Sequence, residues 1–343
     1  MKQQSDIDFV ITWVDGTDPV WQKEKAAYSG QEDIQALAAY TDFSKVRYRN
    51  HGLLLYWFRG VEQFAPWVRK IHFVTCGHLP PWLDVSNPKL NIVRHDEFIP
   101  KVYLPTFNSN AIEMHMHRIK GLSDNFVYFN DDMFLIRPAK ETDFFRAGKP
   151  CDLLAFQPVV ANPANPVMSH LLLNDILVIS KYFNKRENVK KQLGKYFNPG
   201  YPLKNLIYNM IEVMFPKYTG FFSVHGPVPF CKQTFEELWE KEGDQLSQTS
   251  SHRFRSKDDL TIYLLREWQK LTGNFHAKNV DRFFKYFELA ENNYELHQTI
   301  AKQKKKIICI NDVNDQIDFD QINKKLSMAF EEILPKKSSF EKV

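Results

Sequence analysis

The stretch NFVYFNDDMFL, residues 125–135, joins an apolar run to two adjacent carboxylates, Asp131 and Asp132, after which the apolar pattern resumes. The apolar part is typical of a core strand. A buried carboxylate without a partner is costly, so something positive or polar must compensate its charge. We therefore expect a metal ion, an arginine or water beside this pair, at the end of a strand.

Similar apolar runs recur along the chain and alternate with helical patterns. The runs lie at residues 8–14, 70–77, 90–95, 125–130, 152–157 and 306–311. Several of them are apolar at consecutive positions, as in strands that are covered on both faces. Between the first two runs, apolar side chains recur at helical spacing and the pattern stops before Pro66. This alternation predicts an α/β fold with an open, Rossmann-like, nucleotide-binding central sheet.

The pattern changes in the second half of the chain. From about residue 159 to residue 300, helical and aromatic-rich segments dominate, and a strand and a helix return after residue 301. We predict a nucleotide-binding core at 1–158, a large and mostly helical insertion at 159–300, and a C-terminal strand and helix at 301–343 that complete the core.

The composition narrows the class of protein. The 343 residues are 43% hydrophobic and 25% charged, which is typical of a globular protein. The net charge of +4 is too small to indicate nucleic acid, so we expect no nucleic-acid partner. The four cysteines form no C-x-x-C pair, and the N-terminus enters a strand without a signal peptide. These features indicate reduced cysteines in a cytoplasmic protein.

The first predicted strand ends in the motif TWVDGTDPVW, residues 12–21. Ligands of α/β sheets bind at the carboxyl ends of strands, which is where Asp15 and the backbone around Gly16 would lie. The same letters are also typical of an ordinary β-turn. The motif therefore indicates either a nucleotide contact or a simple turn.

Two of the predicted strands end in Asn-Asp. One end carries Asp131 and Asp132, and the other carries Asn311 and Asp312. Mg²⁺ and Mn²⁺ take oxygen ligands, often one or two carboxylates together with substrate phosphates. A helix cap or a turn would explain either motif alone. We expect the two ends to converge at one edge of the sheet.

A helical pattern covers SNAIEMHMHRIKGL, residues 109–122. His115 and Arg118 lie three positions apart along one edge of this predicted helix. The two histidines of His-x-His point apart on a helix, which excludes a two-histidine metal site. We keep His115 and Arg118 as candidate phosphate contacts.

Two further segments carry candidate phosphate chemistry. SVHGPVPF, residues 223–230, fixes His225 on a proline-rigidified segment, where a histidine can take or give a proton; a surface histidine in a loop is the alternative. In SSHRFRSKDDL, Arg255 precedes a helix that we expect to begin at Ser256 with a capping box to Asp259. Arginine donors beside a helix N-terminus suit phosphate.

Taken in order, these segments resemble the conserved regions of the Stealth family. They are DIDFVITWVDGTDPVW, the long block from RYRNHG to YFNDDMFL, HGPVPF with the downstream FRSKDDL, and ICINDVND. Members include bacterial capsular polysaccharide phosphotransferases and the catalytic subunit of the lysosomal-enzyme N-acetylglucosamine-1-phosphotransferase. The resemblance implies a GT-A-like sheet. It also implies transfer of a hexose 1-phosphate or N-acetylhexosamine 1-phosphate from a UDP-sugar to a glycan hydroxyl in capsular or cell-surface polysaccharide, with release of UMP.

The resemblance also implies roles for individual residues. The positions for a Mg²⁺ or Mn²⁺ ion are Asp131, Asp132, Asn311 and Asp312. The positions for catalysis are Asp132, His225, Arg255 and His115. Those for the nucleotide are Asp15, Gly16 and Arg49, which Arg118 joins from the helical pattern. We expect the two arginines Arg255 and Arg49 to stabilise the reacting phosphorus, and His225 or His115 to accept the proton of the acceptor hydroxyl.

Residues 181–222 carry eight basic and two acidic side chains, a net charge of +6. We expect this surface to contact an anionic membrane or a phosphate-containing polymer, which suits a lipid-linked glycan acceptor. Solvated helix faces over an aromatic core are the alternative.

Two other functions fit the same residues. A metal-dependent glycosyltransferase would use a similar acidic cluster but would release UDP, and a non-catalytic glycan-binding protein would not need the acidic and arginine positions. The nucleotide that is released separates the first alternative from phosphotransfer.

Overall fold

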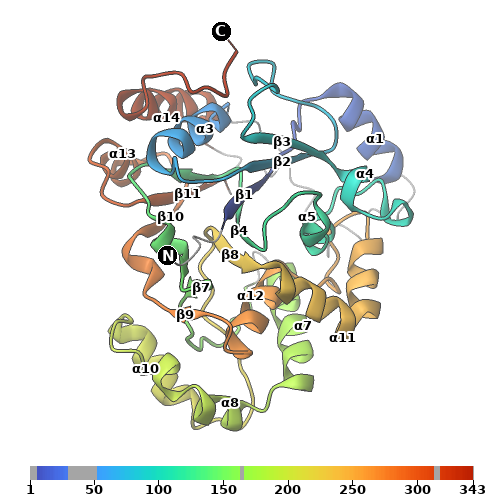
Figure 1. Cartoon of the computed structure of the whole chain (residues 1–343), viewed down its shortest axis with the longest axis vertical. Coiled ribbons are helices and arrows are strands. Elements are labelled where there is room, and N and C mark those ends of the chain that lie inside the picture. The colour runs from blue at the N-terminus through green and yellow to red at the C-terminus, as the bar shows by residue number, and fades with distance from the viewer. Residues whose placement is uncertain (1–5, 30–51, 163–165, 313–316, 343) are drawn as a thin grey trace.

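The computed structural model describes residues 6–29, 52–162, 166–312 and 317–342, and within them five strands form the central sheet (Figure 1). In spatial order the strands are β3 (Leu90–Arg94), β2 (Ile71–Thr75), β1 (Ile7–Thr12), β4 (Asn125–Asn130) and β8 (Val228–Cys231). The first four are parallel, and β8 is antiparallel to β4 at the edge. The order β3-β2-β1-β4 is that of a doubly wound sheet, so the predicted Rossmann-like α/β fold is confirmed.

Helices cover both faces of this sheet, which explains why β1 is buried from Ile7 to Ile11. Phe9 of β1 packs in one core with Trp57 of α3 (Leu54–Phe64). Val10 packs in a second core with Trp268 of α12 (Ile262–Leu271), and α11 (Lys232–Ser251) adds to that core. Successive side chains of one strand therefore enter two different cores, as the alternation along a strand requires.

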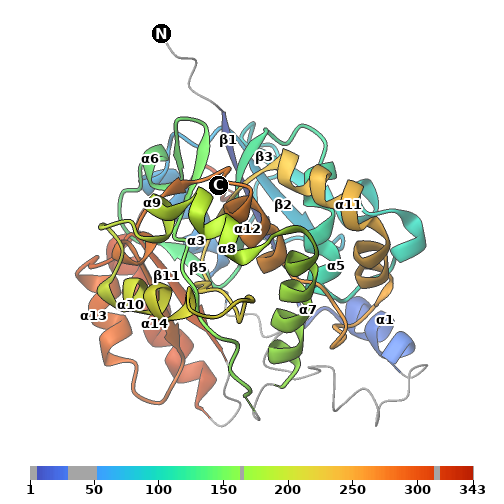
Figure 2. The same ribbon diagram turned by 90° about the horizontal axis from the view of Figure 1, so that it is seen from below.

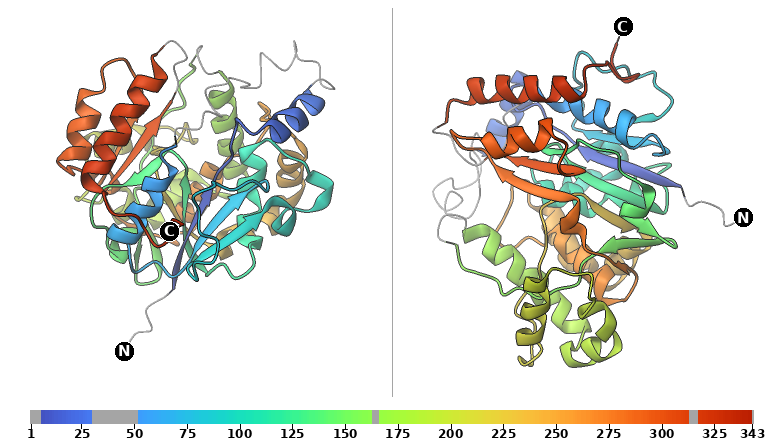
Figure 3. Two further views of the ribbon diagram at one scale, coloured as in Figure 1. Left: turned by 90° about the horizontal axis from the view of Figure 1, so that it is seen from above. Right: turned by 90° about the vertical axis from the view of Figure 1, so that its left-hand side faces the viewer.

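The chain leaves β4 through Asp131 and Asp132 and enters a second sheet, of order β10-β11-β5 (Figure 3). Here β11 (Ile307–Asn311) is antiparallel to β5 (Met133–Leu135) and parallel to β10 (Phe284–Glu288), with α13 (Tyr294–Ala301) and α14 (Phe319–Ile333) packed beside them. The prediction that the two Asn-Asp ends belong to one sheet is therefore wrong. The two ends belong to different sheets, because the apolar run after Asp132 forms a strand of its own.

The region 159–300 contributes helices at the end of the molecule away from α3 and α14 (Figure 1). They are α7 (Pro166–Tyr182), α8 (Lys185–Lys191), α9 (Leu193–Tyr196) and α10 (Leu203–Glu212) (Figure 2). The same region also supplies β8 to the central sheet and β10 to the second one. The division at residues 159 and 300 stays a prediction.

The remaining elements are short or peripheral. They are α1 (Pro19–Ser29), α4 (His95–Phe98), α5 (Ser109–Met114), α6 (Glu141–Phe144), three 3-10 turns at Lys101–Tyr103, Met116–Arg118 and Val280–Arg282, and a third sheet of β6 (Phe145–Arg146), β7 (Lys149–Asp152) and β9 (His276–Ala277).

The strand predicted at 152–157 is largely absent from the described residues. Only an isolated antiparallel bridge between Phe156 and Phe221 forms here, in which the backbone N–H of Phe222 donates to the carbonyl oxygen of Ala155 over 2.9 Å. Side chains satisfy other backbone groups: the backbone N–H of Leu154 donates to the Tyr201 hydroxyl over 3.0 Å, and that of Phe156 donates to Asn209 Oδ1 over 2.7 Å.

Candidate active site

Two segments that are far apart in the sequence meet at the turn between β4 and β5. The backbone N–H of Ile310 donates to the carbonyl oxygen of Asp132 over 2.8 Å. The Cys309 thiol donates to Asp132 Oδ2 over 3.1 Å, although these two residues are 177 positions apart. Asn311 and Asp312 follow directly in the chain, so the structure brings the two acidic segments together.

Negative charge accumulates at this turn. Asp131 is an exposed residue, yet reduced hydration of its carboxyl and the neighbouring Asp132 raise the pKa of Asp131 to about 7. The Oδ1 atom of Asp132 is buried and has no hydrogen-bond partner among the described residues. One potential metal-ligand atom from each of Asp132, His225 and Cys309 lies within 4.8 Å of the other two. An orphaned carboxylate oxygen beside a second carboxylate fits a divalent cation, which supplies the missing positive charge.

His225 faces the same carboxylate. Its Nε2 lies 3.4 Å from Asp132 Oδ2, and its Nδ1 lies 3.2 Å from the hydroxyl of Tyr263 in α12. Burial alone would lower the pKa of His225, but the Asp132 carboxylate outweighs burial and raises that pKa. A histidine in this position can accept a proton, because the carboxylate stabilises the imidazolium that forms.

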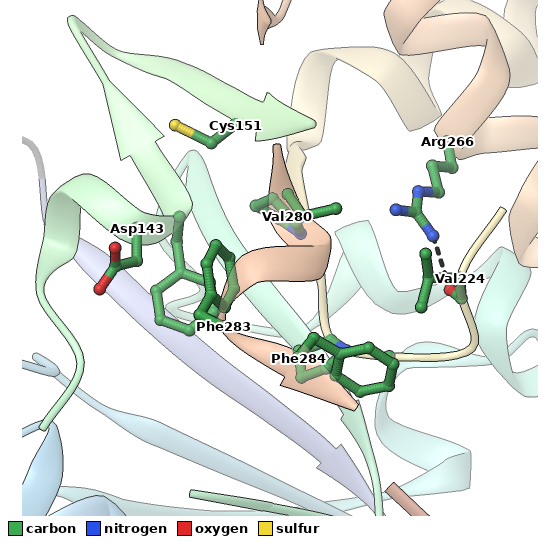
Figure 4. Close-up of a pocket in the computed structure, with 11 residues that line it drawn as sticks. Asp143, Cys151, Val224, Arg266, Val280, Phe283 and Phe284 are labelled. Atoms are coloured by element: carbon green, nitrogen blue, oxygen red, sulfur yellow. Dashed lines mark hydrogen bonds between the residues drawn. The ribbon is translucent and has the colours of Figure 1, made fainter. Parts of the chain in front are cut away.

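The segment that carries His225 borders a mostly apolar pocket, and contacts with the residues that line this pocket hold the segment in place (Figure 4). Arg266 of α12 donates through Nη1 to the carbonyl oxygen of Val224 over 2.8 Å, and its other two nitrogens pair with the buried Asp152 at 2.7 and 2.8 Å. Gly226 lies against the ring of Phe284 so closely that an added Cβ atom would stand 2.7 Å from a ring carbon. Only glycine fits at this position without a shift of its neighbours.

A buried glutamate near His225 was not among the predicted site residues. Glu113 of α5 accepts a hydrogen bond from the Tyr128 hydroxyl over 2.9 Å, and that hydroxyl lies 3.1 Å from Thr12 Oγ1. Burial raises the pKa of Glu113 to about 7, and the positive charges of Arg255 and His225 oppose the rise. The carboxyl of Glu113 is therefore close enough to both candidate catalytic residues to interact with their charges. The only signal in the sequence was a glutamate set among apolar neighbours.

Arg255 lies beside the first turn of α5, where its Nη2 donates to Ser109 Oγ over 2.7 Å. Its charge acts on both Glu113 and His225. The structure thus places Asp132 and His225 in contact, and the charge of Arg255 acts on His225 from beside α5. Arg49, the other predicted contact of the phosphorus, lies outside the described residues.

The helix predicted to begin at Ser256 begins later. α12 starts at Ile262, and Thr261 is its N-cap. The reason is the buried carboxylate of Asp259, which closes a turn rather than a capping box. It accepts hydrogen bonds from the backbone of Ser256 and from the side chains of Asn108 and Asn110.

Asp15 and Gly16 lie beyond the carboxyl end of β1, next to the end of β4, because these two strands are parallel and in register. Asp15 Oδ1 accepts from the backbone N–H of Thr17 over 3.0 Å and from its hydroxyl over 2.7 Å, and the backbone N–H of Asp15 donates to His78 Nε2 over 2.6 Å. The turn is therefore real, and it lies at the ligand-binding edge of the sheet. A nucleotide role for the two residues stays a prediction.

His115 and Arg118 lie against α11 rather than against Asp132. The buried ring of His115 packs between Tyr103 and Trp239, and its Nε2 lies 3.0 Å from Ser250 Oγ. Burial lowers the pKa of His115 to about 3. The guanidinium of Arg118 stacks on Trp239, 4.6 Å from the ring centroid. None of these contacts brings either residue to the acidic turn.

Family models match three parts of the chain. They are described as conserved regions 1, 2 and 3 of the Stealth protein, and they match residues 5–33, 47–152 and 224–266. The matched parts include Asp15, Glu113, Asp132, His225 and Arg255.

Several relatives match along their whole length. The chain is 40% identical to the capsular polysaccharide phosphotransferase WcwK of Streptococcus pneumoniae, with 100% of both chains covered. It is 38% identical to the receptor polysaccharide phosphotransferase WefC of Streptococcus oralis, covering 98% of this chain and 99% of that one. It is 36% identical to the exopolysaccharide phosphotransferase cps2G of Lactiplantibacillus plantarum, covering 98% and 96%. Among solved structures, the apo form of the bifunctional glycosyltransferase WbbM matches 97% of this chain and 51% of its own, with a TM-score of 0.39 and 10% identity.

Proposed function

Because the chain belongs to the Stealth family, and its relatives are named polysaccharide phosphotransferases, we propose the following reaction for this phosphotransferase. It moves a hexose 1-phosphate or N-acetylhexosamine 1-phosphate from a UDP-sugar to a glycan hydroxyl. The product is a phosphodiester, and UMP is released. The observation that carries this proposal is the contact of Asp132 with both Cys309 and His225, which joins the two acidic segments to a candidate base.

In this reaction the acceptor oxygen forms a bond to the phosphorus that carries the sugar. The bond from that phosphorus to the bridging oxygen breaks, and UMP leaves with that oxygen. His225 takes the proton of the acceptor hydroxyl, and Asp132 stabilises the imidazolium. Arg255 neutralises charge on the non-bridging oxygens, which is the main requirement of phosphoryl transfer. The buried His115 has no part in this scheme.

A Mg²⁺ or Mn²⁺ ion would be held by four side chains: Asp131, Asp132, Asn311 and Asp312. The orphaned Oδ1 of Asp132 supports this assignment. The bound ion supplies positive charge to the diphosphate, which lowers the barrier to its cleavage.

Substitution of Asp132 tests the proposal. We expect Asp132→Asn to reduce turnover by about a hundredfold or more, because the variant loses the charge that holds both the cation and the imidazolium. The control is Asp96→Asn, which changes an exposed carboxylate elsewhere and should leave turnover unchanged. A wild-type rate for Asp132→Asn at saturating metal would reject the role, provided that circular dichroism shows the same fold.

The nucleotide product separates phosphotransfer from glycosyl transfer. The purified chain is incubated with a panel of UDP-sugars, Mg²⁺ or Mn²⁺ and candidate glycans, and the nucleotide released is identified by mass spectrometry. UMP together with a phosphodiester-linked sugar supports the proposal. Free UDP with a simple glycosidic product would replace it with the glycosyltransferase alternative.

The proposal extends to the place of action. We place the enzyme in the cytoplasm, where UDP-sugars are available, with residues 181–222 turned toward an anionic membrane and a lipid-linked glycan. The net charge of +6 in this segment supports that placement. Among the described residues, no helix combines the length and the apolar character that a membrane span requires.

A further inference from the structure

Helix α10 presents its amphipathic pattern in the opposite sense to a normal surface helix. Four of its exposed side chains are apolar: 72% of Leu203, 43% of Ile207, 60% of Met210 and 48% of Ile211 face solvent. Its buried side chains are polar: Asn205, Asn209 and Glu212. A surface helix normally buries the apolar stripe and exposes the polar one.

Buried polar contacts hold the helix in this orientation. Asn209 accepts from the backbone N–H of Phe156 over 2.7 Å and donates to the carbonyl oxygen of Tyr196 over 2.6 Å. Glu212 Oε2 lies 3.2 Å from the Nζ of the buried Lys185 of α8. Rolling the helix to hide its apolar face would break an amide network and strand a buried ion pair, which is strongly unfavourable. The apolar face is therefore fixed toward the outside.

The apolar face continues beyond the helix, and the same region of the chain exposes several basic side chains. Met214 and Phe215 follow α10 and are 78% and 48% exposed. The exposed basic side chains are Arg186, Lys190 and Lys191 of α8, Lys204 of α10, and Lys217 beyond the end of α10. The one exposed acidic side chain on these two helices is Glu187. Both helices lie at the end of the molecule that is opposite α3 and α14 (Figure 1).

We infer that α10 is a membrane-docking helix that inserts its apolar face into the surface of an anionic bilayer. Leucine, isoleucine, methionine and phenylalanine side chains would enter the boundary between headgroups and acyl chains, and the lysines would contact the headgroups. This deepens the membrane contact proposed above, because it assigns binding to apolar insertion by six named side chains as well as to charge.

Charge complementarity favours a bilayer over a protein as the occupant. A second copy of this chain would bring the same cluster of positive charge to a two-fold contact, which like-charge repulsion opposes. An anionic bilayer offers negative headgroups above an apolar interior, and it therefore matches both parts of this surface at once.

Vesicle flotation tests the inference. The purified full-length chain is mixed with phosphatidylcholine vesicles that either contain or lack phosphatidylglycerol. We expect binding to the anionic vesicles, and a loss of about tenfold for Met210→Gln, because a side chain that enters the apolar layer is removed. Met328→Gln is the matched control: Met328 of α14 is 61% exposed against 60% for Met210, and its variant should bind like the wild type. Lys204→Glu should also weaken binding, whereas Lys324→Glu on α14 should not.

The outcomes separate this inference from the proposed reaction. Equal vesicle binding by Met210→Gln and Met328→Gln would overturn it, as would failure of the wild type to bind anionic vesicles. A wild-type dimer in light scattering that Met210→Gln dissociates would instead make α10 a contact between copies. Release of UMP with a soluble acceptor should be unchanged in Met210→Gln. Vesicle binding without any UMP release would contradict the proposed reaction alone.

Discussion

At the scale of single residues, Gly226 sets the position of His225. A Cβ atom at this position would stand 2.7 Å from the ring of Phe284, which is closer than real contacts allow. We expect Gly226→Ala to push the segment away from Phe284 and to reduce kcat by about tenfold or more, because a small misplacement of a catalytic group is costly. Steady-state kinetics of UMP release measure the effect.

The control for this variant is Gly194→Ala. Gly194 lies in α9, and no atom of another part of the chain is near enough to meet an added Cβ. This variant should keep the wild-type kcat. Equal rates for Gly226→Ala and Gly194→Ala would show that the contact with Phe284 does not position His225.

Residue type and order along the chain were enough to name Asp132, His225 and Arg255 as candidates. The structure places His225 in contact with Asp132, and the catalytic roles of all three stay predictions. Residue type and order were not enough to distinguish the surroundings of Glu113 in α5 from those of His115 at its C-cap. His115 points into the packing against α11, whereas Glu113 approaches the charges of Arg255 and His225. The break of α5 after Met114 rotates the later residues away from the helical pattern, and nothing in the local sequence specifies that break.

At the scale of elements, the start of β1 depends on one buried carboxylate. Asp8 accepts hydrogen bonds from Arg69 at 2.8 Å, from the backbone N–H of Ser123 at 2.8 Å and pairs with His72 at 3.0 Å. Burial alone would raise the pKa of Asp8, but these partners outweigh it and lower the pKa below its ordinary value of 3.8. The carboxylate therefore holds β1 against its neighbours in the charged form.

Asp8→Asn should lower the free energy of unfolding by about 2 kcal/mol or more near neutral pH. Because the pKa is lowered by folding, the contribution of Asp8 is present above pH 3.8 and is lost as the pH falls through the folded value. Urea unfolding of both proteins at several pH values measures the difference, which should shrink in acid. Asp6→Asn is the control: Asp6 is 69% exposed and lies 3.8 Å from the same Arg69, so its loss should matter far less.

Apolar runs predicted five of the strands to within two residues, because a strand buried on both faces needs continuous apolar side chains. The exceptions are places where side chains take over part of the backbone hydrogen bonding. Asn209 and Tyr201 satisfy the backbone after β7, and Asp259 closes a turn where a helix start was expected. Such long-range side-chain contacts leave no periodic signal in the sequence.

At the scale of the whole molecule, the two cores join segments from both ends of the chain. One core contains Phe9 and Phe129 together with Ile308 and Phe330. The other joins Val10 to residues of β8, α11 and α12. The alternation of strands and helices predicted the class of fold, but it could not reveal that a region with mostly helical character supplies an edge strand to one sheet and a strand to another.

This arrangement predicts that the chain unfolds as one unit. If the region 159–300 were an independent domain, calorimetry would show more than one transition. Removing that region, however, would expose the edge of β4 that pairs with β8 and would take β10 from β11. We therefore expect a single thermal transition, with equal calorimetric and van't Hoff enthalpies. We also expect residues 1–158 expressed alone to lack a cooperative transition, because β5 loses β11 and one core loses the helix α14. Co-expression with residues 159–343 should restore it, and a fragment 1–158 that unfolds cooperatively by itself would show that the core does not need the later strands.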